Sequence, residues 1–371
     1  MVSVPYGCCA MDNRGFSRHY FFLLDNESLF RRITEIMFIE KLSNAFGVSG
    51  NEDEVRTLIE DEIKDSVDSI ETDSIGNLIT YKSGKKRRPK VMLAAHMDEV
   101  GFMITNIEKD GWLKFNTVGG IDDRVLPSKV VMVGDKKIRG VIGIPPPHLT
   151  KKSERDKVIK IKDLRIDIGA KNKEDAEKYV KTGDYATFAT NFSRMENGLI
   201  KGKAFDDRIG CAILTELLKD TYPFALYGVF TVQEEVGLRG ATVAAYRVEP
   251  EVAFVLEGTA AGDFPIKKDL SKAAHVGKGT VVTHMDRSVI CDKELVSLLI
   301  NIAEKNGIPY QFKRPMIGGT DAGKIRTTKS GTKAAVLSVP LRYIHSPVSI
   351  ASLSDIENTK RLISLTLRSL K

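Results

Sequence analysis

The chain has 371 residues, of which 42% are hydrophobic and 28% are charged, as in an ordinary globular protein. Its net charge of +7 comes from 56 basic and 49 acidic residues that are interspersed, which argues against a nucleic acid as partner. The four cysteines form no ligand-spaced cluster, which argues against a disulfide framework and a cysteine-rich zinc site, and favours a reducing, cytoplasmic location. No apolar run approaches the roughly 20 residues of a membrane span, so we expect no membrane partner.

The first 36 residues have no clear hydrophobic period. Their apolar stretch is too short for a signal peptide, and no basic region precedes it. We therefore expect residues 1–36 to be an atypical extension of little structural importance. Met37 is a plausible native start, a hypothesis that mass spectrometry of the protein from its own cell would test.

The segment from Met37 to about residue 100 predicts alternating helices and strands. Helical spacing covers 37–42 and 52–63, and a strand with a central turn covers 70–81. The basic segment 82–90 resembles a phosphate-binding patch, but its Gly and Pro favour a solvated hairpin turn. The wholly apolar run 91–95 is typical of a strand that is buried on both faces of a parallel sheet.

The pattern changes between residues 101 and 194. Short strands separated by Gly, Pro and Asp predict an inserted small β-barrel domain. Within it, 145–162 predicts a long exposed loop, and 175–181 predicts one short helix. The predicted strands are 112–118, 130–133, 138–144 and 185–192.

The α/β alternation returns after Ala204. It predicts a mostly parallel mixed sheet between helices, in a discontinuous domain of residues 37–100 and 195–371. The predicted strands are 226–232, 252–256 and 334–339, and the predicted helices are 208–218, 241–245, 295–305 and 354–367.

Histidines and carboxylates follow several of the predicted buried strands or lie near them. In open α/β sheets, ligands bind beyond the carboxyl ends of the strands, so these side chains are expected to meet. They are His96 with Asp98, Asp206, the pair Glu234 and Glu235, Glu257, and His345.

Each of these residues also has a purely structural interpretation. The Glu234–Glu235 pair can open an exposed loop, Asp206 can cap a helix, and a single histidine is often only a structural residue. The recurrence at successive strand ends or loops favours a shared site. Imidazole and carboxylate ligands suit zinc, cobalt or manganese, and two histidines with three carboxylates suffice for two ions if one carboxylate bridges them.

The order and wording of the motifs resemble the tetrahedral (TET) aminopeptidases, a family of co-catalytic metallopeptidases of the glutamyl-aminopeptidase and deblocking type. The resemblance runs from about Met37 to the C-terminus. It implies a zinc-exopeptidase-like α/β fold with an inserted PDZ-like barrel. The matching motifs are AAHMDEVGFM, KAFDDRIGC, TVQEEVGLRGA, LEGTAAGDFP, IGGTDAGKI and RYIHSP.

The resemblance also implies a role for each candidate residue. Two divalent ions, zinc or cobalt, would be held by one set of His96, Asp206 and Glu257 and a second set of Glu235, His345 and the bridging Asp206. Glu234 would be the general base and acid, and Asp98 would orient His96. The Asp206–Asp207 peptide bond is expected to be cis. Many relatives carry Asp where this chain has Glu257. The longer side chain puts in question the site that binds the substrate's α-amino group.

The implied reaction is removal of N-terminal residues from short peptides by a water molecule shared between the two metals. Asp321 and Thr320, in a glycine-rich loop, and His148, in the inserted domain, are candidates for substrate contact. A glycine-rich turn with a capping aspartate is the simpler interpretation of that loop. The resemblance implies homo-oligomers, dodecamers built from dimers, with assembly contacts in the inserted domain.

Two other functions remain open at this stage. Relatives labelled endoglucanases suggest a glycan hydrolase, in which two carboxylates act on a glycosidic bond but the histidines have no role. An inactive assembly scaffold or peptide-binding chaperone could keep the same fold, although every proposed ligand position is filled.

Overall fold

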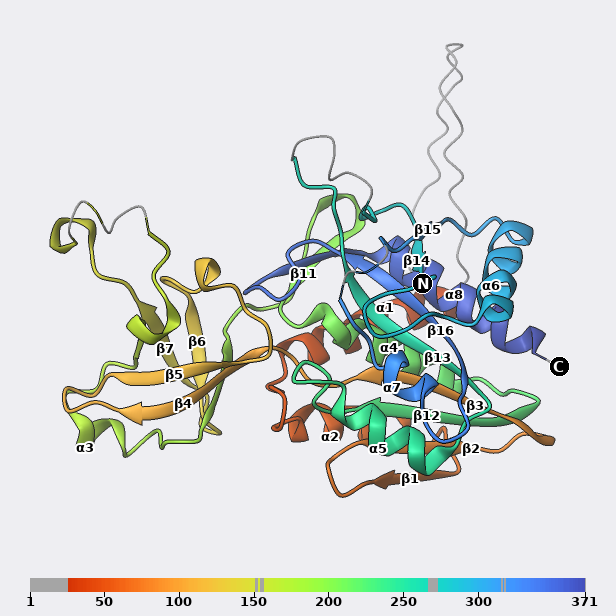
Figure 1. Ribbon diagram of the computed structural model, residues 1–371, viewed down its shortest axis with the longest axis horizontal. Coiled ribbons are helices and arrows are strands. Elements are labelled where there is room, and N and C mark those ends of the chain that lie inside the picture. The colour runs from red at the N-terminus through yellow and green to blue at the C-terminus, as the bar shows by residue number, and fades with distance from the viewer. Residues whose placement is uncertain are drawn as a thin grey trace, which may run out of the picture.

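The computed structural model describes residues 26–150, 153, 157–265, 273–314, 316 and 318–370. Two bodies lie side by side, a large α/β body and a smaller β-barrel inserted after its third strand (Figure 1). The expected α/β fold with an inserted all-β barrel is therefore confirmed. No helix in the described part of the chain is long and apolar enough to cross a membrane.

The α/β body is built on an eight-stranded mixed sheet. Its four central strands, β12, β3, β13 and β16, run parallel to one another. The strands that flank them, β2 beside β12 and β14 beside β16, run antiparallel to their neighbours. In spatial order the strands are β1 (Ser69–Thr72), β2 (Leu78–Lys82), β12 (Phe224–Thr231), β3 (Lys86–His96), β13 (Val252–Ala260), β16 (Lys333–Leu341), β14 (Thr280–Val282) and β15 (Tyr310–Phe312).

The central strands are buried on both faces, which explains their unbroken apolar sequences. Residues 91–95 of β3, 253–256 of β13 and 334–337 of β16 are all buried. Strands of parallel sheets read this way because helices cover both faces. Burial of such runs is worth about 25 cal/mol per Å² of apolar surface, so these strands form the stable base from which the site projects.

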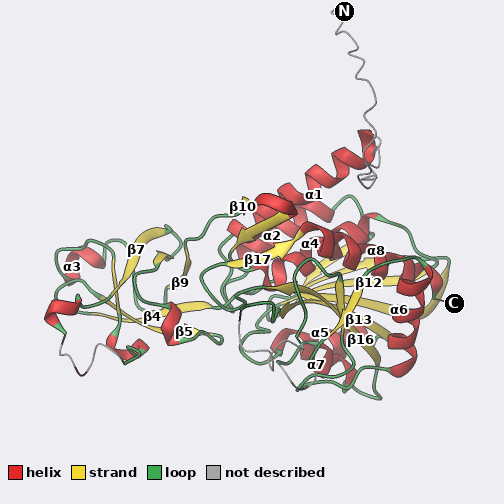
Figure 2. Ribbon diagram, turned by 90° about the horizontal axis from the view of Figure 1, so that it is seen from above, coloured by secondary structure: helices red, strands yellow, loops and turns green. Residues whose placement is uncertain are grey.

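Helices cover both faces of the sheet (Figure 2). On one face, α4 and α8 contact the strands, and α1 and α2 pack on α4; on the other, α5 and α7 contact β12, β13 and β16. Helix α6 packs against α8 and β16. The helices are α1 (Asn26–Asn44), α2 (Asp53–Ile63), α4 (Phe205–Lys219), α5 (Arg239–Val248), α6 (Lys293–Lys305), α7 (Ala322–Arg326) and α8 (Leu353–Ser369).

The inserted domain is a closed six-stranded barrel with its own apolar core. Phe102 lies at its centre and meets Phe115 and Phe188 edge to face, with ring centroids 5.2 and 5.1 Å away. Around the barrel the strands are β4 (Gly101–Ile107), β5 (Leu113–Val118), β8 (Arg165–Asp167), β7 (Ile138–Gly143), β6 (Val130–Val133) and β9 (Tyr185–Phe188), and its short helix is α3 (Lys173–Ala176). Residues 193–202 then return the chain through β10 (Ser193–Arg194) and β11 (Leu199–Gly202). These two strands pair with each other, and β11 also pairs with β17 (Ser349–Ser352).

Two local predictions, a hairpin turn at 82–90 and a barrel helix at 175–181, are wrong. Segment 82–90 is not a hairpin turn, because β12 lies between β2 and β3 and the second half of the segment is already strand. The short helix of the barrel lies at Lys173–Ala176, earlier than the expected 175–181. Its N-cap, Asn172, accepts a hydrogen bond from the Asp175 amide and so fixes the earlier start.

Helix α1 begins at Asn26, well before the expected 37–42. Ile36 is buried in the main core, and Glu35 accepts a hydrogen bond of 2.5 Å from Lys360 on α8. The last residues before Met37 therefore pack on the α/β body, contrary to the expectation that 1–36 has little structural importance. Residues 1–25 lie outside the described part of the chain.

Candidate metal centre

The residues singled out in the sequence meet at one edge of the sheet. His96 ends β3, Glu257 lies in the second half of β13, and Glu234 and Glu235 follow β12. Because β12, β3 and β13 are parallel neighbours, their carboxyl ends lie together. Asp206 comes in from the start of α4, and His345 from the turn that follows β16.

Asp206 lies between the two histidines. Its Oδ1 is 3.5 Å from Nε2 of His96, and its Oδ2 is 3.4 Å from Nε2 of His345. Glu257 Oε2 lies 3.7 Å from Nε2 of His96, and Glu235 Oε1 lies 3.1 Å from Nε2 of His345. Two three-residue groups thus share one carboxylate, and the ligand atoms within each group lie within 4.8 Å of one another.

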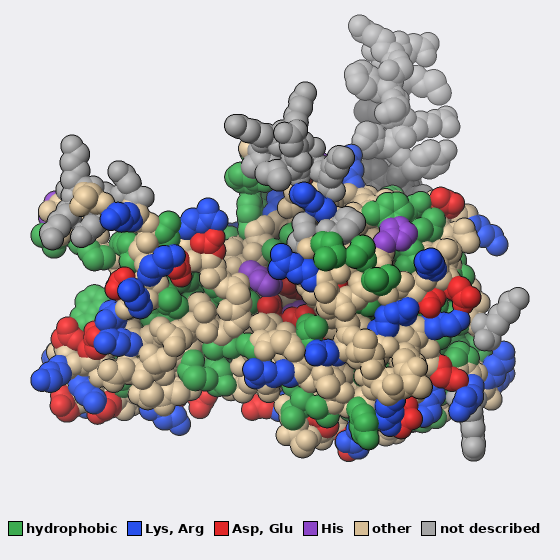
Figure 3. Space-filling model, in the orientation of Figure 1, with side chains coloured by type: hydrophobic (Ala, Val, Ile, Leu, Met, Phe, Trp, Pro, Cys, Tyr) green, Lys and Arg blue, Asp and Glu red, His purple; other side chains and the backbone are tan. Residues whose placement is uncertain are grey.

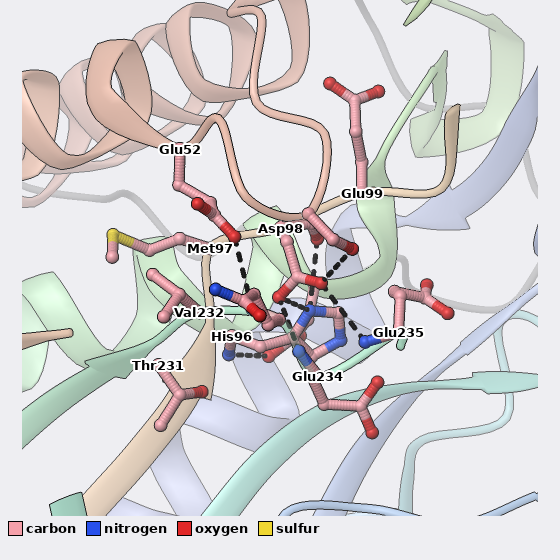
Figure 4. Close-up of polar contacts among 12 residues, drawn as sticks. Glu52, His96, Met97, Asp98, Glu99, Thr231, Val232, Glu234 and Glu235 are labelled. Atoms are coloured by element: carbon pink, nitrogen blue, oxygen red, sulfur yellow. Dashed lines mark hydrogen bonds and ion pairs between the residues drawn. The ribbon is translucent and has the colours of Figure 1, made fainter. Parts of the chain in front are cut away.

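Glu234 and Glu235 are adjacent, but their carboxylates point in different directions (Figure 4). Glu235 belongs to the His345 group, whereas Glu234 forms a further group with Glu235 and His96. Both residues lie in the segment after β12, where Gln233 has a left-handed backbone conformation (φ 56°), and one dipeptide can thus supply two separate functions.

The site brings together more carboxyl groups than its two histidines can balance. Burial raises the pKa of the Glu257 carboxyl and that of Glu234 well above their usual range, although His96 acts against this. Burial alone would lower the pKa of His345, but hydrogen bonds to Asp206 and Glu235 raise it to about 11. Ionised carboxylates at this density need further positive charge nearby.

The residues fit divalent cations. Two imidazoles with carboxylates are a donor set of zinc, cobalt and manganese sites. Glu257 Oε1 is buried and has no hydrogen-bond partner, an arrangement that is costly unless a ligand occupies the remaining space. The peptide bond between Asp206 and Asp207 is cis, as the family resemblance implied.

Asp98 lies beside His96, as expected, and also contacts the Glu234–Glu235 backbone. Its carboxylate accepts hydrogen bonds from the backbone amides of Glu234 (3.0 Å) and Glu235 (3.1 Å) (Figure 4). It also accepts a hydrogen bond from the Ser49 hydroxyl (2.6 Å). The nearest Asp98 atom to His96 Nδ1 is the backbone carbonyl, at 3.1 Å, and the carboxylate is 3.5 Å away. The side chain of Asp98 therefore fixes the Glu234–Glu235 backbone more directly than it fixes the imidazole.

The three candidates for substrate contact lie in different surroundings. Asp321 is buried, accepts a 2.5 Å hydrogen bond from Thr231, and has a pKa raised by burial to about 6. Its Oδ1 has no partner. Thr320 turns its hydroxyl to Asp286, at 3.2 Å. His148 is exposed in the turn Pro147–Leu149 of the inserted domain, and it belongs to neither three-residue group.

A cleft of about 310 Å³ opens over the two groups. Figure 3 shows acidic and histidine side chains gathered in a hollow near the middle of this face. The cleft is also lined by Leu238, Ile344 and Lys313, which the sequence reasoning missed. Lys313 follows a three-residue strand and carries no motif, so only the fold could reveal it.

Glu52 was also missed. It is buried, and it accepts a hydrogen bond from the amide of Gln233, next to Glu234. Burial raises the pKa of Glu52 to about 7. In the sequence, Glu52 is recognisable only as the first residue of the predicted helix 52–63.

Residues 76–362 match the family described as M42 glutamyl aminopeptidase. Lysyl aminopeptidase from Pyrococcus furiosus is 35% identical over 343 residues, covering 90% of this chain and 96% of the relative. Among solved structures, the TET aminopeptidase from Thaumarchaeota archaeon SCGC AB-539-E09 is 39% identical with a TM-score of 0.87, covering 91% of this chain and 98% of that one.

Two further solved structures bear on assembly and on the alternative function. Pyrococcus horikoshii TET1 peptidase, titled as able to assemble into a tetrahedron or a large octahedral shell, is 38% identical with a TM-score of 0.81, covering 91% of this chain and all of that one. A Thermotoga maritima structure titled endoglucanase is 40% identical with a TM-score of 0.75, covering 89% and 96%. With the family match spanning most of its length, the chain belongs to the M42 glutamyl aminopeptidase family and is a metallo-aminopeptidase.

Proposed function

We propose that this enzyme removes N-terminal residues from short, unblocked peptides with the help of two divalent cations, zinc or cobalt. His96, Asp206 and Glu257 would hold one ion, and Glu235, His345 and Asp206 the other. The observation that carries the proposal is the position of Asp206, which directs one carboxylate oxygen toward each histidine.

The ions would supply Lewis-acid activation of a water molecule and stabilisation of negative charge on the peptide carbonyl oxygen. The protein's own contribution is proton transfer. Glu234 groups with His96 and Glu235 and is half-buried, and its raised pKa suits a residue that accepts a proton from water and returns it to the leaving amine.

Other residues would position these groups and the substrate. Asp98 would fix the Glu234–Glu235 backbone through its two amide contacts. Asp321, with one carboxylate oxygen unpartnered, is our candidate for a contact near the substrate's amino group, and Thr320 would hold its loop in place through Asp286.

We further propose that the catalytic domain comprises residues 37–100 and 195–371, extended at its start by α1, and that 101–194 form the assembly domain. One related structure is described as a dodecamer, and another as able to assemble into a tetrahedron or a large octahedral shell, which supports a homo-oligomer here and makes a dodecamer the expected form. A cytoplasmic location is the one that the reduced, buried Cys211 and Cys291 favour.

A paired assay tests the proposed function. Purified protein is stripped with a chelator, then supplied with zinc, cobalt or manganese, and assayed on free and N-acetylated peptides and on a cellulosic polysaccharide. We expect metal-dependent release of the first residue from the free peptides. Polysaccharide cleavage without peptide cleavage would support the glycan hydrolase instead, and no activity in any arm would support an inactive scaffold.

A further inference from the structure

The segment that follows β12 carries two glutamates of the metal centre, and side chains of other elements hold its backbone. The pairing of β12 with β3 ends at Thr231. Beyond that point, the four consecutive amides of residues 232–235 each donate a hydrogen bond to a side-chain oxygen. In chain order the acceptors are Asn77 Oδ1 (3.0 Å), Glu52 Oε1 (3.1 Å), Asp98 Oδ1 (3.0 Å) and Asp98 Oδ2 (3.1 Å).

The backbone of this segment depends on such contacts. Gln233 has a φ of 56°, in the left-handed region that is unfavourable for a residue with a Cβ. A conformation of this kind persists only where the surroundings enforce it. On the other side of the chain, the carbonyl of Val232 accepts a hydrogen bond from the Gly240 amide (3.0 Å), and that of Gln233 accepts one from the Arg239 amide (3.2 Å). The direction of Glu234 therefore depends on contacts along both sides of the turn.

Asn77 is the first of these anchors and has support of its own. It directly precedes β2, and its side chain is fully buried. Because the Val232 amide is a donor, the oxygen of Asn77 faces it, and Nδ2 donates to Asp73 Oδ2 (2.7 Å) and to the Gly240 carbonyl (3.0 Å). Asp73 Oδ1 in turn accepts the amides of residues 75–77, which fixes the turn between β1 and β2.

The contact between Asn77 and the metal-centre segment is closely packed. A Cβ added at Gly240, the second residue of α5, would lie 2.3 Å from Asn77 Oδ1 and 2.4 Å from the Val232 carbonyl oxygen. The described residues that line the cleft over the metal centre do not include Asn77 or Asp73. Within that cleft, these two residues can influence a reaction only through the backbone that they hold.

We propose that Asn77, held by Asp73, is a positioning residue for Glu234. It anchors the amide of Val232, two residues before Glu234, and so fixes the direction in which the chain leaves the sheet. Without this anchor a buried amide lacks an acceptor, and the segment relaxes away from the geometry that aligns Glu234 with its substrate. The inference rests on the proposed function, in which Glu234 transfers the proton.

The experiment begins with Asn77→Leu, which keeps the approximate size of the side chain but removes the acceptor. Metal-loaded wild type and variant are assayed on the best-cleaved member of a panel of aminoacyl p-nitroanilides. We expect kcat to fall about tenfold or more, because the general base is misaligned. KM should stay within about twofold, because the lining of the cleft is unchanged.

The decisive measurement repeats this substitution in a Glu234→Gln background. If Asn77 acts through Glu234, the two changes are not additive. The remaining kcat of Glu234→Gln should then fall by less than about twofold when Asn77→Leu is added. A merely structural contribution of Asn77 would lower kcat by the same factor in both backgrounds.

A matched control and a rescue separate positioning from stability. Thr80 is buried in β2 and donates to the Gly228 carbonyl of β12 (3.0 Å), so Thr80→Val removes a hydrogen bond between the same strands but inside the sheet. It should leave kcat unchanged. Asp73→Asn and Asn77→Asp exchange donor and acceptor, so each alone should lower kcat, and the two together should restore most of it.

Two results would overturn the inference: an unchanged kcat in folded Asn77→Leu, or an equal loss of kcat with and without Glu234. If Asn77→Leu does not fold, Asn77→Asp takes its place in both backgrounds, with the same two results decisive. A wild type that is inactive on every unblocked substrate, or Glu234→Gln with full turnover, would instead reject the proposed function itself.

Discussion

Two buried polar clusters meet at the end of β3, and they differ in how their charges are balanced. One surrounds His96 and contains more carboxylates than cations. The other surrounds Glu99, three positions further along the chain, and is complete. Glu99 accepts hydrogen bonds from Lys203 (2.7 Å), Arg208 (3.2 Å) and Thr187 of barrel strand β9 (2.8 Å).

The cations of the Glu99 cluster are also satisfied by the backbone. Lys203 donates to the Ala45 carbonyl at 2.6 Å, and Arg208 donates to those of Met97 and Leu42 at 2.7 and 2.6 Å. By contrast, Glu257 in the other cluster keeps a buried oxygen without a partner. A complete network holds two domains together, whereas an incomplete one of similar burial is built to receive a ligand.

The largest effect is expected from Glu234→Gln. Glutamine keeps the size of the side chain but cannot accept the proton, so kcat should fall by about a thousandfold or more. The stripped and reloaded variant should still bind metal, as elemental analysis would show. A variant with near wild-type turnover would disprove the role of Glu234.

A substitution in the Glu99 cluster should lower the free energy of unfolding by the same amount with and without metal. Lys203→Met leaves Glu99 without its shortest ion pair, and breaking a buried pair in this way costs about 3–5 kcal/mol. Urea unfolding should show this loss with and without added metal. Lys201→Met, an exposed lysine two residues earlier, is the control and should change stability little. A loss present only in the metal-loaded protein would contradict the division between the clusters.

Asp98→Asn should weaken the metal centre without unfolding it. An amide offers one acceptor oxygen in place of two, so one of the contacts to the Glu234 and Glu235 amides is lost. Residues that orient metal ligands typically change metal affinity about 10- to 100-fold. Titration calorimetry measures the metal affinity of the wild type and of Asp98→Asn. Ser49→Ala, which keeps both amide contacts, should have the smaller effect, and equal effects would argue against this role of Asp98.

The smallest effect concerns Glu52 and pH. Burial raises the pKa of Glu52 from its usual value of 4.5 to about 7, so between these pH values the folded state holds a proton that the unfolded state has released. This contribution to stability is complete below pH 4.5 and is lost as pH rises to 7. In metal-free protein, Glu52→Gln should gain about 2 kcal/mol relative to wild type between pH 5 and 8. Parallel pH profiles of unfolding free energy would contradict it.

The sequence predicts the central strands and the candidate ligand residues near their ends because both are local patterns. An apolar run predicts a buried strand, and the residues just after the run, such as His96 or the pair Glu234 and Glu235, are then expected at the end of that strand. Asp206 and His345 required only the rule that strand ends converge.

Features that depend on distant pairing could not be predicted. β12 inserts between β2 and β3, and this overturned the hairpin expected at 82–90. Glu52 reaches Gln233 across 181 positions, and Lys313 enters the cleft from a short edge strand. Their side-chain types are common on surfaces, so only the three-dimensional arrangement distinguishes them.

The most direct test of the account is the number of cations bound per chain. Stripped protein is reloaded with zinc or cobalt, dialysed and analysed by elemental mass spectrometry, alongside Asp206→Asn. The account predicts two ions per wild-type chain and, because both groups share this carboxylate, loss of binding at both positions in the variant. Two ions retained by Asp206→Asn, or none bound by the wild type, would contradict it.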